Sequence, residues 1–156
     1  MASGIPGAQL RRLLLGTAVA GAAKTVPQNA TGTIFTVAGG RVLVTGLVGK
    51  VTTVIGGTTP SAKLVATPTV GSANDLCTAT AITADEVGTL YSIPGPTGSA
   101  LGVSGSGSGG VTGQTAPVIV AAGTIGVNIS AADATGAIQW TLTYVPLDDG
   151  ATVTAA

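Results

Sequence analysis

The sequence contains no histidine, a single cysteine and very few charged or aromatic side chains. Six acids and six bases are spread over 156 residues, so the formal net charge at neutral pH is zero. Acid–base, nucleophilic and metal-assisted catalysis rely mainly on His, Cys, Asp, Glu and Lys. This composition favours a structural protein over an enzyme, and we expect no catalytic residue, no cofactor and no metal site.

Positive charge is too sparse for a nucleic-acid-binding surface. The pair Arg11-Arg12 is the longest run of bases, whereas proteins that bind nucleic acid concentrate Lys and Arg on one face. We therefore expect no nucleic-acid partner. A net charge of zero also gives copies of the chain little mutual repulsion, and an uncharged β-rich monomer would be prone to aggregate. The charge balance favours an oligomer or a surface-bound subunit.

The few reactive side chains do not form a recognisable site. Cys77 lies in an alternating apolar stretch, and without a histidine to act as its base we expect a small buried apolar residue. An active site would instead need several of Asp85, Glu86, Asp133 and Asp148 to converge in a cleft. Their spacing in the sequence does not predict that convergence.

Glycine, threonine and valine dominate what is present. The chain has 25 glycines and 25 threonines, but only four aromatic residues, so leucine, isoleucine and valine must build the core. Branched side chains favour strands, and glycine supplies turns. The length suits one domain. We expect an all-β fold.

Short alternating stretches separated by turn residues recur along the body. They predict strands at residues 33–38, 41–45, 47–55, 62–67, 76–83, 89–93, 118–122, 124–130, 137–145 and 151–156. Gly39-Gly40 predicts a hairpin between the first two strands, and Gly49 a bulge or bend. By parity, Trp140, Leu142 and Tyr144 share one face. This spacing predicts an antiparallel sandwich or barrel in a single β-domain over residues 31–156.

One segment of the body departs from this pattern. Residues 94–117 are rich in Gly and Ser and too long for an ordinary connection, so we expect a protruding loop or hairpin. Within it, residues 105–110 match the GxGxxG pattern of dinucleotide-binding sites. That motif requires a strand before it and a helix after it, and the segment that follows cannot form such a helix. Residues 83–86 predict a turn or a single helical turn.

The N-terminal segment admits two interpretations. Arg11 and Arg12 precede an apolar run over residues 13–23, which is typical of an export signal, including the twin-arginine kind. Alternatively, apolar residues recur at helical spacing and predict a docking arm: Leu10, Leu13, Leu14 and Ala18. We expect the arm, extended or partly helical, over residues 1–30. The apolar run is too short to span a membrane, so we expect no membrane partner.

If residues 1–30 form a docking arm, its contacts with a partner are expected at one small set of residues. The set comprises the leucines and bases of the helical stripe and one valine after it: Leu10, Arg11, Arg12, Leu13, Leu14 and Val26.

Four stretches of the body carry a family resemblance. They are residues 33–42 (TIFTVAGGRV), 75–77 (DLC), 88–93 (GTLYSI) and 140–147 (WTLTYVPL). Together they resemble small β-rich virion structural proteins of tailed bacteriophages, and most of all head decoration (cement) proteins. The resemblance covers most of residues 33–156, and its motifs are structural rather than catalytic.

The resemblance implies a subunit on the capsid surface of the virion, made in the cytoplasm of the bacterial host. Its implied partners are the major capsid protein and its own copies, as a trimer or another small homo-oligomer. Such a subunit stabilises the capsid because bound partners stabilise one another. A tail or fibre subunit of the phage would share this composition. A secreted β-rich surface or adhesion module would explain the Thr and Gly content and the signal-like start.

Overall fold

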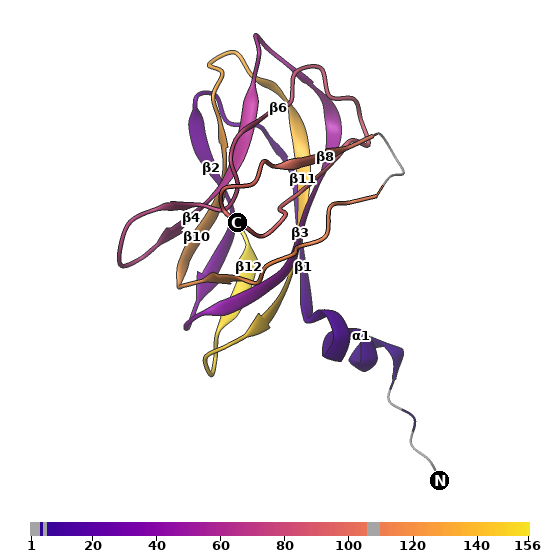
Figure 1. The fold of residues 1–156 in the computed structure, drawn as a ribbon, viewed down its shortest axis with the longest axis vertical. Helices are drawn as coiled ribbons and strands as arrows, with labels where there is room; N and C mark the ends of the chain where they lie inside the picture. The colour runs from indigo at the N-terminus through magenta and orange to yellow at the C-terminus, as the bar shows by residue number, and fades with distance from the viewer. Residues whose placement is uncertain (1–3, 5, 106–109) are drawn as a thin grey trace.

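The computed structural model describes residues 4, 6–105 and 110–156, and it confirms an all-β fold. Two antiparallel six-stranded sheets pack face to face as a sandwich (Figure 1). Sheet A has the order β1 (Thr17–Thr25), β11 (Thr135–Pro146), β3 (Val42–Gly56), β7 (Leu90–Ser92) and β8 (Gly102–Ser104), and β9 (Val118–Val120) also pairs with β3. Sheet B has the order β12 (Thr152–Ala155), β2 (Ala30–Ala38), β10 (Gly123–Ile129), β4 (Ser61–Pro68) and β5 (Asn74–Asp75), and β6 (Thr80–Ala81) also pairs with β4.

The core lies between the inner faces of the two sheets. Phe35 and Ile125 from sheet B and Leu142 from sheet A are completely buried. On β11 the predicted parity is confirmed, because Trp140, Leu142 and Tyr144 are buried whereas Thr141 is exposed. The alternation follows from the period of two in a strand, in which one face packs on the core and the other meets solvent.

The long strand β3 corrects two sequence predictions. Residues 41–45 and 47–55 were expected to be separate strands, but β3 runs through both, over 15 residues. A bulge opposite Thr143 and Tyr144 joins the two halves, so the buried positions change parity between Val44 and Leu47. Gly49, in contrast, keeps regular pairing with Trp140. The prediction of a bulge or bend at Gly49 is wrong, because the indole ring of Trp140 packs over this glycine.

The predicted hairpin at Gly39-Gly40 is also wrong. β2 belongs to sheet B and β3 to sheet A, so the two glycines carry the chain from one sheet to the other. Both have positive φ angles, 77° and 146°, which explains why the connection needs glycine. A diglycine predicts a reversal of the chain, and only sheet packing decides whether the next strand pairs or crosses over.

Residues 76–83, predicted as one strand, are broken into short pieces. Leu76 donates its N–H to the carbonyl of Leu64 at 2.8 Å, and β6 pairs with β4 further along. Between them Cys77 is completely buried, and its Sγ accepts a hydrogen bond from the N–H of Leu64 at 3.3 Å. The prediction that Cys77 is a buried apolar residue is confirmed. The expected turn over residues 83–86 is also confirmed.

The predicted loop over residues 94–117 is anchored at both ends. Thr115 donates its N–H to the carbonyl of Pro94 at 2.8 Å, and β8 lies within the segment and pairs with β7. The segment therefore adds one short strand, β8, to sheet A. The glycines and serines at 106–109 lie outside the described residues.

Residues 17–25 form a strand where the sequence predicted part of the docking arm. β1 pairs with β11 along the edge of sheet A, with one bulge between Ala20 and Ala23. Its run of small residues carries little strand propensity of its own, so pairing with β11 decides its conformation. Only the helix α1 (Gly7–Leu15) stands apart from the sandwich (Figure 1).

Candidate interaction surface

The helix α1 begins and ends at residues suited to those positions. Pro6 precedes it, and the Pro6 carbonyl accepts hydrogen bonds from the N–H groups of Gln9 and Leu10 at 2.8 and 3.1 Å. Gly16 ends it with a φ of 85° and donates its N–H to the carbonyl of Arg12 at 3.0 Å. A left-handed glycine is a common helix terminus. The sequence therefore limits α1 to nine residues.

Two contacts hold the end of α1 on the body. The Thr45 hydroxyl, on β3, donates to the carbonyl of Leu15 at 2.7 Å, and it lies 3.0 Å from the hydroxyl of Thr143. A Cβ at Gly16 would overlap the carbonyl oxygen of Tyr144, so the chain passes close to β11 here. The base of the helix is therefore pinned to two neighbouring strands of sheet A.

Beyond this base, α1 leaves its apolar side chains in solvent. Leu10, Leu14 and Leu15 are 48%, 73% and 58% exposed. Leu15 was not among the predicted contact residues, although the run of three leucines at residues 13–15 could have identified it. Arg12 is exposed as well. The apolar stripe of α1 therefore has no cover within the described part of this chain.

The other predicted contact residues fall into two groups. Arg11 and Leu13 belong to α1, but their side chains lie outside the described part of the structure. Val26 is 4% exposed and belongs to the core, and its N–H donates to the carbonyl of Gly136 at 3.1 Å. The structure therefore brings Leu10, Arg12 and Leu14 together on one element and places Val26 in the interior.

Charge is divided unevenly between the arm and the body. Residues 1–16 contain two bases, Arg11 and Arg12, and no acid, whereas the rest of the chain contains four bases and six acids. Residues 1–16, the part of the predicted arm that precedes β1 and is called the arm from here on, therefore carry a formal charge of +2, and the body, residues 17–156, carries a formal charge of −2. The arm is attracted to an acidic surface and repelled by a basic one.

The carboxylates that an active site would need are engaged separately. Asp85 accepts a hydrogen bond from the Tyr91 hydroxyl at 2.7 Å, and burial together with this bond raises the pKa of Tyr91. Asp133 accepts hydrogen bonds from the hydroxyl and N–H of Thr58, which lower its pKa. Among the described residues, no three His, Cys, Asp or Glu side chains gather closely enough to hold a metal ion.

The carboxylate of Asp148 has a structural partner. It forms an ion pair with Arg41 at 2.8 Å, and it also accepts the N–H of Arg41 at 2.7 Å. These hydrogen bonds lower the pKa of Asp148 to about 2. The ion pair links the start of β3 to the turn after β11, and both carboxylate oxygens already accept hydrogen bonds from Arg41.

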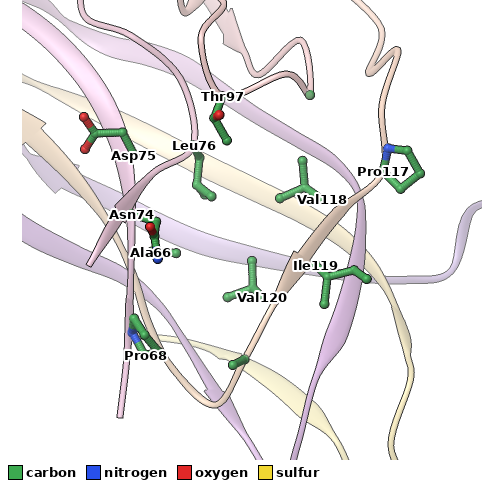
Figure 2. A pocket seen from close by; sticks show the side chains of 12 residues that line it. Ala66, Pro68, Asn74, Asp75, Leu76, Thr97, Pro117, Val118, Ile119 and Val120 are labelled. Carbon is green, nitrogen blue, oxygen red and sulfur yellow. The ribbon is translucent and has the colours of Figure 1, made fainter. Parts of the chain in front are cut away.

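A groove opens between the two sheets at the edge farthest from β1. Its volume is about 370 Å³, and β9 forms one wall (Figure 2). The other wall comes from the end of β4, at Ala66 and Pro68, and from Leu76 after β5. At one end, the Thr69 N–H donates to the Ala122 carbonyl at 2.8 Å, which joins the two walls. The sequence carries no motif for this groove, because its walls are distant in the chain.

The lining of the groove is mainly apolar, with one charged residue. Ile119 at the centre of β9 is 60% exposed, and Figure 2 shows it beside Val118 and Val120. Asp75 is the charged residue of the lining. Its Oδ2 pairs with the ammonium of Lys63 at 2.7 Å, and its side chain remains 47% exposed.

Comparison of the chain with protein-family models, with curated proteins and with solved structures finds no match. No helix in the described ranges has the length and apolar character needed to cross a membrane.

Proposed function

We propose that this protein is a non-enzymatic structural component of a tailed-bacteriophage virion, which decorates the capsid and stabilises it. Its partners are the major capsid protein and other copies of the chain. The observation that carries the proposal is α1, a short helix pinned at its base, with three leucines largely in solvent. A helix of this length is marginal in water unless its apolar stripe is buried. A partner subunit would bury it.

The energetics of α1 favour attachment over exposure. Fully burying one leucine side chain contributes about 1.5–3 kcal/mol. In the free chain about half or more of each of three side chains is still exposed, so about half or more of that free energy is available on binding at Leu10, Leu14 and Leu15. A few kcal/mol per copy, repeated over many copies, would stabilise an assembly substantially.

The body supports the same proposal. The stretches with the family resemblance fall mostly on elements of the sandwich, such as β2 and β11, and supply its core. Asp85, Asp133 and Asp148 have separate local partners. These side chains hold turns and strand ends in place, which suits a rigid subunit of a particle.

Reconstitution on virions tests the proposal. Particles stripped of the protein are incubated with the full chain, with a variant lacking residues 1–15, and with Leu14→Asp; occupancy is measured by imaging and particle stability by thermal melting. The truncation ends before Gly16 because β1 belongs to the sheet. We expect the full chain to bind the head and raise its melting temperature, and both variants to bind less. Labelling confined to the tail, or no binding to virions, would contradict the proposal.

A further inference from the structure

We propose that the groove beside β9 is the docking site for α1 of a second copy of this chain. This inference rests on the proposed function and deepens it by naming a second copy of the chain as the partner of α1. It rests on the complementary chemistry of two surfaces that one chain leaves uncovered.

The first surface is the exposed leucine stripe of α1. At 1.5 Å per residue, nine residues span about 14 Å. Leu10 and Leu14 are four residues apart and therefore lie on one face of the helix. They form a compact apolar patch.

The second surface is the groove, which has the size and lining to receive that patch. Its volume of about 370 Å³ lies in the range of binding pockets. Val118 and Val120 lie on the side of β9 that faces Leu76, and Ile119, on the opposite side of the strand and 60% exposed, lies at the rim (Figure 2). β9 pairs only with β3 among the described strands, so no further strand covers its outer edge.

Charge favours the same pairing. The arm carries Arg11 and Arg12 without an acid, and the body carries the opposite net charge. The charged residue of the groove lining is the acid Asp75. Lys63 donates a hydrogen bond to Oδ2 of Asp75, whereas Oδ1 of Asp75 accepts no hydrogen bond from the described residues. An arginine at the rim can therefore add to this pair.

The arm belongs to a second copy because its base is fixed away from the groove. β1 is the terminal strand of sheet A, and β9 lies beyond β11 and β3. That separation is three strand spacings, or about 14 Å. The bond from Thr45 to the Leu15 carbonyl holds the end of α1 on the outer face of sheet A, and none of the described side chains of α1 lines the groove.

The geometry of this contact restricts the assembly. The helix and the groove are different surfaces, so the contact is heterologous. Every copy can dock its arm in a heterologous assembly of finite size in two ways. Either the copies close into a ring, or two copies exchange their arms reciprocally. A discrete small oligomer in solution is therefore expected, without any capsid present.

Mixed disulfide formation tests the site directly. One preparation carries Leu14→Cys and the other Ile119→Cys, so a disulfide between the two can form only between copies. Cys77 is buried and remains in both. The matched control replaces Ile119→Cys by Val54→Cys, since Val54 is 50% exposed and does not line the groove. We expect roughly tenfold more mixed dimer with Ile119→Cys than with the control. Equal yields would overturn the inference.

Sedimentation of the isolated protein provides the second measurement. Leu14→Asp and Ile119→Asp should each weaken association at least about tenfold, which corresponds to about 1.4 kcal/mol, whereas Val54→Asp should not. Arg12→Glu should weaken it and Lys50→Glu, an equal charge change on the body, should not. A wild-type monomer at high concentration would overturn the inference. Because no virion is used, failure here leaves the capsid reconstitution unaffected, and failure of reconstitution leaves this result unaffected.

Discussion

Replacing Gly49 by alanine tests the contact between β3 and the single tryptophan. A Cβ at Gly49 would lie 2.7–2.8 Å from three carbons of the Trp140 ring, where ordinary contacts begin near 3.4 Å. The ring has little room to move, because it is 3% exposed and Tyr91, completely buried, packs against it at a centroid distance of 6.2 Å. The substitution must therefore displace a buried aromatic pair.

The expected cost follows from two opposing effects. Forcing an extra methyl into a packed core costs about 1–3 kcal/mol, and reduced flexibility of the unfolded chain returns about 0.4–1 kcal/mol. The net loss in the free energy of unfolding is about 1–2 kcal/mol. For a domain of this size, we expect Tm to fall by roughly 2–8 °C. Thermal and urea unfolding followed by circular dichroism measure it.

Two further variants make the test specific. Gly21→Ala places its Cβ at ordinary distances, 3.5 Å from the Trp140 carbonyl oxygen and 3.8 Å from Ala155, so it should leave stability unchanged or slightly raised. In a Trp140→Phe background the Gly49→Ala substitution should cost less, because the clashing ring atoms are gone. If the alanine costs the same in both backgrounds, or nothing in either, the assigned contact is refuted.

Three other perturbations have defined outcomes. Leu142→Ala, at a completely buried position, should lower the free energy of unfolding by about 2–5 kcal/mol, whereas Val70→Ala, at an 89% exposed position, should change it by no more than about 0.5 kcal/mol; equal losses in urea denaturation would contradict the burial pattern. Arg41 lowers the pKa of Asp148 to about 2, below the value of about 3.9 in an unfolded chain. The ion pair therefore stabilises the fold above pH 4 and is lost as the pH falls toward 2, and Asp148→Asn should flatten the dependence of the urea midpoint on pH in that window; an unchanged slope would refute the linkage. Burial raises the pKa of the Cys77 thiol, so a thiol reagent should label Cys77 only at the rate of global unfolding, and rapid labelling of the native protein would contradict its position in the core.

The elements predicted well are those in which local pattern and tertiary role agree. β11 was predicted from alternation alone, and the structure buries Trp140 and Leu142 on one face while Thr141 stays exposed. The strands predicted at residues 62–67, 124–130 and 151–156 are likewise observed, as β4, β10 and β12. On β11 a period of two matches one packed face and one exposed face, whereas β4 and β10 each bury three consecutive residues.

The elements predicted poorly are those in which a local signal has two meanings. Gly39-Gly40 indicates a reversal, and only packing of the two sheets makes it a crossing between them. Residues 17–25 are small and apolar, and pairing with β11 makes them a strand rather than part of an arm. Val26 follows that strand into the core. Its prediction as a contact residue of the arm was wrong because its burial depends on the pairing of β1 with β11, which the local sequence does not show.

The candidate interaction surface divides in the same way. The leucine stripe and the two arginines are local features, readable from the spacing of Leu10 and Leu14 along the chain. The groove has no local signature, since β9, Leu76 and the end of β4 come together only when the sheets pack. A surface built within one helix can be predicted from its sequence, whereas a surface built between sheets cannot.

The sequence by itself determined the fold class and the sparse chemistry of this chain. Branched and small residues without histidine favour strands over helices and leave few reactive groups. Those are additive properties of the side chains. The tertiary structure decided which strands pair, where the arm ends, and that one edge of the sandwich is left open as a groove. Those depend on contacts between residues far apart in the chain, whose free energies are realised only when both sheets are in place.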